Sequence, residues 1–592
     1  MTPRQDKKPK QIHPPRFWSL QAIPWSRLLL GLFAIAAIWR WFYVDRLLES
    51  PLSKSMFDDA RIYWAWSDRI AHGHLVGVYP FFLAPLYPYV LGLLRAVGVN
   101  APATVLAVQS LWGAAAVALL ADAARRLTTP AIGLAVGVLI AFYEMAVFFD
   151  GLFLSESLLF FVAASFLWWA VRFEWPTAEA WKAAILGLLA GFLAAGRATA
   201  GLLVVPSLFL VRARRLNLAA VLVGFGAAVL PIALHNDAAS REWIPFTYNS
   251  GFNLYVGNNP KATGGYVPIV RDRGQPQGLD GGVELDGRDE LKATERREFT
   301  PRQSSDHWTA KAASFARHHP GTVFRLALRK LAMLWNAREY PQIENVEEYR
   351  RFAGPIGLPL IGTFTVLGAL AIAGAAFAAA ASERGRFLVG YVVLLTLGTL
   401  PFFVTDRYRH ELIPGCALLA AFSLARLEAM WRYKTISWSA AALPLLGLLI
   451  VHLPISGPTS QQREALLARN SAARLLQAGW SAAQEGRVEE AERNFTEAVR
   501  AEPRLYDAWG ALIRVQVQEG RLGEARKTLV RARDSGMPDL PFHVYQGLLA
   551  AMSHDLGAAG DALRQVAAES LVFHPDLANV VTFTRHQMSQ AR

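Results

Sequence analysis

The sequence predicts an α-helical protein, a polytopic membrane bundle of about 11 spans that carries a soluble α-helical tail. Three observations support this fold class. Of the 592 residues, 53% are hydrophobic and only 18% charged, with a mean hydropathy of +0.24, which is too apolar for a soluble chain of this length. Apolar segments of membrane length alternate with basic clusters. The last part of the chain repeats with a fixed period.

The net charge of +13 has a simple explanation in a membrane protein, because cytoplasmic loops concentrate lysine and arginine. We therefore expect no nucleic-acid partner. The single cysteine, Cys416, excludes an internal disulfide framework. Residues 1–25 form a basic, polar tail without a small-residue cleavage site after the first apolar run, so we predict a cytoplasmic tail and an uncleaved first span.

We predict that the membrane part is one domain over residues 26–455, with outer loops at 45–100 and 235–336. Basic clusters fall repeatedly on one side, which predicts a cytoplasmic N-terminus and an outer, periplasmic C-terminal tail in the inner membrane. Arg40 is expected to snorkel toward head groups from the first span. Residues 81–98 and 321–336 are expected at the membrane interface. The predicted spans are 28–44, 101–121, 131–149, 152–171, 183–196, 198–211, 218–234, 355–381, 387–404, 411–425 and 437–455.

After a linker at 456–464, residues 465–592 show an internal repeat. Val488, Leu522 and Leu556 are 34 residues apart, and this period with paired helices is that of the tetratricopeptide repeat. Gly-Arg marks the turn between helices in the first two units, and His554-Asp555 replaces it in the third. The repeats predict a docking surface for a partner or acceptor; the alternative is a helical cap that only stabilises the outer face.

The first outer loop carries two adjacent acids, Asp58 and Asp59, followed by Tyr63 and further aromatic residues. A carboxylate pair next to the membrane surface can accept a proton or hold a cation. Adjacent helical residues project about 100° apart, so one acid would face the reaction while the other orients it. The alternative is a solvated loop with two ordinary acids.

Further polar residues stand near the outer ends of later spans. Glu156 begins a span, where an unpaired carboxylate is costly and suggests function; it could also be a hydrogen-bonded acid at a helix start. Arg197 lies between two short apolar segments. Arg407 and Arg409 precede another span and suit a phosphate held near the membrane, although head-group anchoring would also explain them.

Residues 246–260 alternate aromatic side chains with asparagine and glycine, and Tyr255 and Asn258 are the candidate sugar contacts. Flat apolar faces and amide groups are the surfaces that proteins commonly offer to sugars. The alternative is a β-like loop of tight turns without a ligand. The sequence contains no glycine-rich phosphate loop, no paired Cys/His metal spacing and no nucleophile motif.

Together these residues resemble a known family. The acidic pair in the first outer loop, Pro-Leu-Tyr-Pro at 85–88, the span-starting Glu156 and the run from Arg407 to Pro414 are similar to the GT-C membrane glycosyltransferases. The nearest branch is that of bacterial relatives of protein O-mannosyltransferases and lipid A aminoarabinose transferases, of glycosyltransferase family 39 type. The resemblance covers roughly residues 28–455.

The resemblance implies transfer of a hexosyl or pentosyl group from a polyprenyl-phosphate donor to an acceptor hydroxyl of a glycan, lipid or protein, outside the membrane and with inversion. It implies Asp58 as base, Asp59 as its orienter or as a metal ligand, and Arg197, Arg407 and Arg409 around the phosphate. The usual pair in this family is Asp-Glu, so a divalent cation stays an open cofactor here. The alternatives are a lipid-linked sugar transporter or flippase and a non-catalytic envelope scaffold that presents the repeats.

Overall fold

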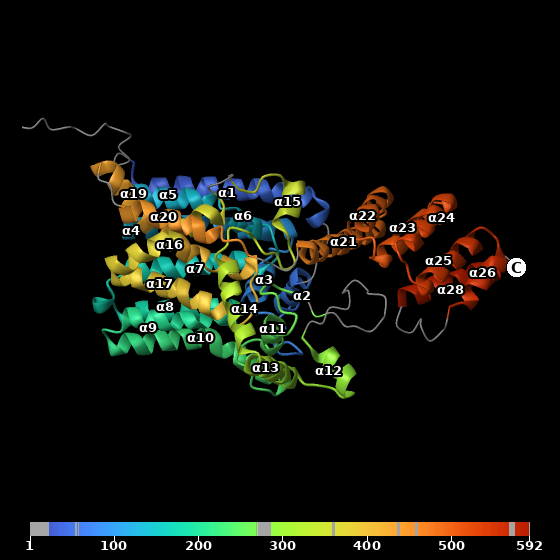
Figure 1. The fold of residues 1–592 in the computed structure, drawn as a ribbon, viewed down its shortest axis with the longest axis horizontal. Helices are drawn as coiled ribbons and strands as arrows, with labels where there is room; N and C mark the ends of the chain where they lie inside the picture. The colour runs from blue at the N-terminus through green and yellow to red at the C-terminus, as the bar shows by residue number, and fades with distance from the viewer. Residues whose placement is uncertain are drawn as a thin grey trace, which may run out of the picture.

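A computed structural model describes residues 23–53, 56, 59–267, 269, 286–357, 362–434, 438–455, 460–566 and 575–590. Within these ranges the regular elements are helices, and the only β pairing is an isolated bridge between Gly265 and Val404. The helices form two parts along the long axis of the molecule, an apolar bundle and a tail of short helix pairs (Figure 1).

The bundle consists of apolar helices that run roughly parallel to one another (Figure 1). They are α1 (Trp25–Glu49), α4 (Pro102–Leu127), α5 (Pro130–Ala141), α7 (Ser155–Arg172), α8 (Ala180–Gly196), α9 (Val204–Val211), α10 (Arg215–Ser240), α16 (Phe364–Ala381), α17 (Glu383–Thr399), α19 (Ile413–Tyr433) and α20 (Trp438–Val451).

Five of these helices, α1, α4, α10, α16 and α19, are long and apolar enough to cross a bilayer, and the chain is a membrane protein. A sixth span results if α5 and the short α6 (Glu144–Asp150), which meet at 54°, count as one. Each predicted apolar segment coincides with one of the bundle helices, so the segments are found where the sequence places them. The count of about 11 crossings stays a prediction, since several helices are short.

The short helix α8 packs closely against α10 because glycines face each other's backbone. A Cβ added to Gly187 would lie 2.0 Å from the carbonyl oxygen of Val221, and one added to Gly224 would lie 2.0 Å from that of Ala184. Small residues let membrane helices approach to this distance and gain dispersion contacts. This contact explains how α8, an apolar helix of 17 residues and shorter than the usual span, is held inside the bundle.

Arg40 does not snorkel, so the expectation for this residue is wrong. Its side chain is fully buried and its Nε lies 2.6 Å from Asp150 Oδ2. Its Nη1 donates to the carbonyl oxygens of Ala36 and Ala141. The side of α1 that carries Arg40 packs against protein, and the buried carboxylate replaces the head groups as partner.

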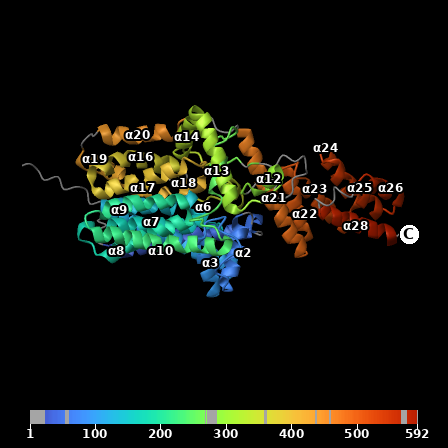
Figure 2. The same cartoon turned by 90° about the horizontal axis from the view of Figure 1, so that it is seen from below.

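Shorter helices gather at the end of the bundle that faces the tail (Figures 1 and 2). They are α2 (Asp59–Ala71), α3 (Leu86–Ala96), α6, α11 (Ser250–Gly257), α12 (Arg288–Glu295), α13 (Pro301–His318), α14 (Pro320–Leu334), α15 (Val346–Ala353) and α18 (Asp406–His410). The 3-10 turns in the described part of the chain are η2 (Pro51–Ser53), η3 (Trp175–Thr177) and η4 (Ala198–Leu203).

The tail is made of α21 (Ser460–Gln484), α22 (Val488–Ala501), α23 (Tyr506–Gln518), α24 (Leu522–Asp534), α25 (Asp539–Met552), α26 (Leu556–Arg564) and α28 (Pro575–Gln590). Alternate helices begin at Val488, Leu522 and Leu556, so the 34-residue period of the sequence is the period of the structure. The first helix begins at Ser460, inside the predicted linker, because its α-helical run is continuous across the expected boundary.

The turn before each second helix needs a left-handed residue. Gly486 and Gly520 occupy it with φ of +75° and +71°, and His554 occupies it in the third unit with φ of +60°. Glycine adopts this conformation without a Cβ clash, whereas histidine does so at a cost. The third unit is therefore a true repeat that departs from the pattern at its turn.

The first repeat helix is anchored to the bundle. Arg474 of α21 is 3% exposed and forms ion pairs with Glu344 and with Glu348 of α15. Gln477 donates to the carbonyl oxygen of Met56, three residues before Asp59. The repeats thus lie at the same end of the bundle as the acidic loop (Figure 1).

Candidate functional site

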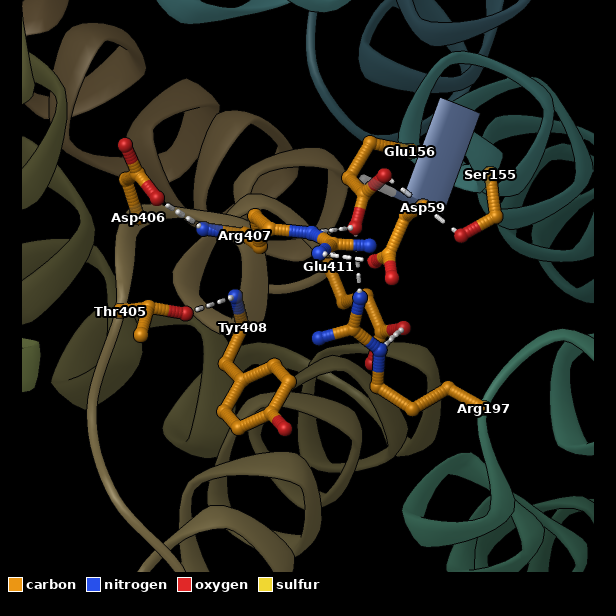
Figure 3. A network of polar contacts seen from close by, with 9 residues as sticks. All are labelled: Asp59, Ser155, Glu156, Arg197, Thr405, Asp406, Arg407, Tyr408 and Glu411. Atoms are coloured by element: carbon orange, nitrogen blue, oxygen red, sulfur yellow. Dashed lines mark hydrogen bonds and ion pairs between the residues drawn. The ribbon is translucent and has the colours of Figure 1, made fainter. Parts of the chain in front are cut away.

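Acids and arginines from four distant parts of the chain meet in one cluster (Figure 3). Asp59 begins α2, Glu156 is the second residue of α7, and Arg407 lies in α18. Arg407 Nη1 lies 2.7 Å from Asp59 Oδ2 and Arg407 Nε lies 2.6 Å from Glu156 Oε1. The three side chains are buried. Two charge-assisted hydrogen bonds therefore fix the Arg407 guanidinium between two carboxylates.

Arg197 joins the same cluster from the C-terminal end of α8. Its Nη2 lies 2.9 Å from Glu156 Oε1 and its Nε lies 2.7 Å from Glu411 Oε1, while its guanidinium carbon stands 4.4 Å from the centre of the Tyr408 ring. Its Nη1 is buried and has no hydrogen-bond partner among the described residues. A buried N–H without a partner is costly, so this nitrogen is available to an incoming anion.

The short helix α18 holds Arg407 in place. The Thr405 hydroxyl caps it by accepting from the Tyr408 amide, and the Asp406 carboxylate accepts from the Arg407 amide at 2.7 Å. The segment before it is pinned as well, because the Val404 amide donates to the carbonyl oxygen of Gly264. Capping and this bridge set the direction of a helix that is too short to hold its own shape.

The charges of the cluster depend on one another. Burial alone would lower the pKa of Arg407, but the charges of Glu156 and Asp59 outweigh it and raise that pKa well above its ordinary value. Burial, followed by the charge of Asp59, raises the pKa of the Tyr63 phenol. Tyr63 packs edge-on against Tyr87 at 5.3 Å. Arg407 therefore stays a cation and Tyr63 a neutral wall of the site.

Asp58, the predicted base, lies outside the described residues, directly before Asp59. A divalent cation finds no built site in what the structure does describe: no group of three or more histidine, cysteine or acidic residues could hold a metal there. The oxygens of Asp59 and Glu156 that face the centre of the cluster accept from Arg407 instead. Among the described residues, these carboxylate oxygens are therefore occupied by arginine N–H groups.

The structure separates Arg409 from Arg407. Arg409 is paired with Glu339, donates to the carbonyl oxygens of Asn336 and Arg338, and stands 4.4 Å from the centre of the Phe364 ring. Residues two positions apart in a helix point to different sides. Arg409 therefore anchors α18 to the segment after α14 and does not reach the cluster.

Tyr255 and Asn258 do not bond the acids or arginines of the cluster in the described part of the chain, although Tyr255 packs in the same hydrophobic cluster as Tyr408, on whose ring Arg197 stacks. Residues 250–257 form helix α11, so the β-like alternative for this stretch is wrong. The Asn258 amide donates to the carbonyl oxygens of Leu254 and Pro401, and its oxygen accepts from Lys330 Nζ at 3.3 Å. The Tyr255 ring packs on Trp308 with centroids 4.9 Å apart. Asn258 supports the segment that leads to α18.

The sequence prediction missed two buried charged residues, Glu411 in the arginine cluster and Lys330 beside Asn258. Glu411 pairs with Arg197, and the only signal for it was an acid at the start of a span. Lys330 is 1% exposed and its Nζ also donates to the carbonyl oxygen of Leu400 at 3.1 Å. It is one of several basic residues of an amphipathic helix, and nothing in the spacing distinguishes it from its neighbours.

Comparisons with known proteins bear on both parts of the chain. Residues 482–552 match the tetratricopeptide repeat family, so the tail carries these repeats. No curated protein matches the chain.

Among solved structures, the chain is similar to the archaeal oligosaccharyltransferase AglB from Archaeoglobus fulgidus in complex with an inhibitory peptide and a dolichol-phosphate, with a TM-score of 0.37 and 12% identity over 75% of this chain and 56% of that one. A second structure of the Archaeoglobus fulgidus oligosaccharyltransferase, tethered to an acceptor peptide, matches with a TM-score of 0.38 and 14% identity over 78% and 58%. The chain spans little more than half of the length of that protein.

Proposed function

We propose that this membrane protein is a glycosyltransferase that moves a sugar from a polyprenyl-phosphate donor to an acceptor hydroxyl on the outer face by an inverting single displacement. The observation that carries the proposal is the cluster of Asp59, Glu156, Arg407 and Arg197, in which the buried Nη1 of Arg197 has no hydrogen-bond partner among the described residues. At the end of a membrane bundle, this cluster places carboxylates that can accept a proton beside fixed cations that can bind a phosphate.

The donor side of the reaction needs positive charge rather than a strong acid, because phosphate is a good leaving group. Arg197 Nη1 offers a hydrogen bond to a phosphate oxygen, and Arg407 adds a second cation. Their positions are set before a ligand arrives by Glu156, which bonds both guanidiniums. Prearranged charges stabilise a transition state without reorganisation.

The acceptor side needs a base. The acceptor hydroxyl gives its proton to the Asp58 carboxylate as its oxygen forms a bond to the anomeric carbon, and the bond from that carbon to the phosphate oxygen breaks with its electron pair. Asp59 is held by Arg407 and serves to orient the loop and its neighbour. A single base suffices here, unlike in glycosidases, which use two carboxylates in opposed roles.

The test is sugar transfer by the purified protein in nanodiscs, supplied with polyprenyl-phosphate sugars and the membrane and protein fraction of its host. Asp58→Asn should lower the rate about 10²–10⁴-fold, as expected for a lost general base. Arg197→Gln should also lower the transfer rate, because it removes the guanidinium N–H that is proposed to bond the donor phosphate. Arg212→Gln is the control, because Arg212 pairs with Glu383 at a half-exposed site. Wild-type rates in both Asp58→Asn and Asp59→Asn would reject the assignment.

The proposed orientation has a cytoplasmic N-terminus and outer repeats in the inner membrane. A reporter that is active only in the cytoplasm, fused after residue 592, should give no signal. A strong signal would place the repeats and the acidic loop inside.

One observation favours the transporter alternative. The buried pair of Arg40 and Asp150 lies within the bundle, where ionisable groups commonly mark transport pathways. A transporter would move a fluorescent lipid-linked sugar across a proteoliposome membrane without consuming it, and Asp150→Asn would stop it. When an acceptor with a free hydroxyl is added to the same proteoliposomes, a glycosyltransferase moves the sugar to that hydroxyl and releases polyprenyl phosphate, and this product separates the two functions.

A further inference from the structure

Helix α14 carries a row of exposed apolar side chains, the apolar stripe. Phe324, Leu328 and Leu331 are 64%, 51% and 38% exposed. They are four and three residues apart, so they lie on one face of the helix. Single apolar side chains are normal on a protein surface, whereas a contiguous row of them marks a surface that contacts lipid or another partner.

Two arginines flank the apolar stripe. Arg325 and Arg329 directly follow Phe324 and Leu328, so they project about 100° further round the helix. Arg325 donates to the Thr322 hydroxyl of its own helix at 3.4 Å, and neither arginine forms an ion pair within the described ranges. Residues 307–338 contain six lysines and arginines and no aspartate or glutamate. The second half of α13 and all of α14 therefore contribute positive charge only.

The C-terminal end of α14 is fixed at the level where membrane helices end. The Trp335 ring lies 6.1 Å from the ring of Phe364, the first residue of α16. The Ala337 amide donates to the carbonyl oxygen of Val451, the last residue of α20, at 2.7 Å. Since α16 is long and apolar enough to cross a bilayer, its end lies at the boundary between hydrocarbon and head groups. This end of α14 lies at the same boundary.

The direction of α14 is that of a helix in the membrane plane. Figures 1 and 2 show α14 lying across the direction of the bundle helices. Its other face is held by protein, because Lys330 and Met333 are buried and Lys330 Nζ donates to the carbonyl oxygen of Leu400 at 3.1 Å. The apolar stripe and its two arginines therefore keep a fixed direction on the opposite side of the helix.

Exposed leucines lead along α20 to the same junction. Leu445 and Leu449 of α20 and Leu453 just after it are exposed and four residues apart. The carbonyl oxygen of Leu453 accepts from Asn336 Nδ2 at 3.0 Å, two residues after α14 ends. In a membrane protein such leucines contact acyl chains. Lipid is therefore the cover that the surroundings of α14 already provide.

The two sides of the exposed surface match the two parts of a phospholipid. A helix in the membrane plane places its apolar side chains among acyl chains and its basic side chains among head groups. Guanidiniums bond phosphate oxygens, and an excess of positive charge favours lipids with a net negative charge over zwitterionic ones. A nucleic acid or an acidic protein segment would use the arginines but leave the apolar stripe in water.

We propose that α14 is an in-plane membrane anchor that binds anionic phospholipids. Its apolar stripe lies among acyl chains, and Arg325 and Arg329 bond the phosphate groups of the lipids beside it. This anchor would serve a glycosyltransferase and a transporter alike, so it stands apart from the proposed function.

The test measures lipid contact at one position of the full-length protein in nanodiscs. The buried Cys416 is replaced by alanine, and Leu328→Cys carries a fluorescent label. Phosphatidylglycerol or phosphatidylcholine with a nitroxide on the acyl chain, at equal mole fraction, quenches the label on contact. Val530→Cys, an exposed position of α24, is the reference for a label in water. Both lipids should quench the Leu328 label, and phosphatidylglycerol should act as if it were about fivefold or more enriched.

Paired charge changes test the phosphate contact. Arg325→Gln/Arg329→Gln should bring quenching by the two lipids to within about twofold while the label stays in lipid. Lys527→Gln/Arg585→Gln removes two exposed cations of the tail and should keep the full preference. Salt at 1 M should reduce the preference in the wild-type background, because it screens exposed charges. Circular dichroism and the thermal midpoint check that each variant is folded.

Two results would overturn the anchor. If lipid quenches the Leu328 label no more than the Val530 label, the apolar stripe faces water or a protein. If the two lipids quench equally in the wild-type background, or if Arg325→Gln/Arg329→Gln keeps the preference, the arginines do not bind anionic lipid. Phe324→Cys provides a second label position, and the single variants Arg325→Gln and Arg329→Gln serve if the double variant does not fold.

Discussion

Replacing Arg407 with methionine is the most direct perturbation of the arginine cluster. In the wild type three buried carboxylates, of Asp59, Glu156 and Glu411, share two guanidiniums. Arg407→Met removes two charge-assisted bonds of 2.7 and 2.6 Å and leaves three carboxylates to Arg197 alone. Removing one partner of a buried ion pair typically costs about 3–5 kcal/mol. We expect a loss of stability of this size.

The double variant Arg407→Met/Glu156→Gln tests the cause. It removes one charge of each sign and restores the wild-type excess of one carboxylate, so it should recover about 0.5–3 kcal/mol relative to the sum of the single changes. The measurement is thermal unfolding in nanodiscs with a double-mutant cycle.

Arg212→Met is the matched control, because its ion pair with Glu383 is as short, at 2.5 Å, but 46% and 48% exposed. It should cost at most about 1 kcal/mol. Equal losses in Arg407→Met and Arg212→Met, or no coupling in the double variant, would refute the reasoning.

Three further outcomes follow from the structure. Burial lowers the pKa of Lys330 to about 8, so the folded state releases this proton before the unfolded chain does. Stability should therefore rise between about pH 8 and pH 10, and Lys330→Met should flatten that rise in a series of thermal midpoints. His554→Gly should stabilise the tail by about 0.5–1 kcal/mol while Gly520→Ala destabilises it by about 1 kcal/mol, since both positions have positive φ; equal effects of one sign in denaturant titrations would contradict this. Arg474→Gln should free α21 from α15 and increase protease cleavage between the bundle and the repeats, whereas Arg526→Gln, on the far side of the repeats, should not.

The parts of the fold that depend on local periodicity could be predicted from the sequence. The helices that begin at Val488, Leu522 and Leu556 follow the repeat of small and apolar residues, because each unit needs the same packing face. The apolar segments of the bundle were found for a similar reason: composition over a whole segment decides whether it can be surrounded by lipid and protein.

Pairing between distant side chains could be predicted only in part. The sequence made four residues candidates because an unpaired charge at the end of a membrane span is costly. The structure brings these four together: Asp59, Glu156, Arg197 and Arg407. Which arginine joins them depends on the direction of a short helix, so Arg407 and Arg409 could not be told apart. The partner of Arg40 could not be found either, because Asp150 lies 110 residues away on a helix that bends back from α5.

The balance of charge in the cluster sets a condition on any phosphate ligand. The three acids Asp59, Glu156 and Glu411 outnumber the two guanidiniums, so the site without a ligand offers a phosphate no excess of positive charge. A phosphate that bonds only Arg197 Nη1 displaces no carboxylate, but one that also bonds Arg407 at Nε or Nη1 must displace Glu156 or Asp59. Asp59 is the one that can leave, because Arg407 is its one ion-pair partner among the described residues and because it begins α2. Glu156, bonded by both arginines at the start of α7, stays. Entry of the phosphate would then release Asp59 in the same step that places the donor, so that the acidic pair becomes free to act on the acceptor only when a sugar is bound. Asp59→Asn, which weakens the competing ion pair, should accordingly bind the phosphate donor more tightly than wild type while transferring its sugar more slowly, and a donor affinity unchanged by that substitution would show that the phosphate does not compete with Asp59 for Arg407.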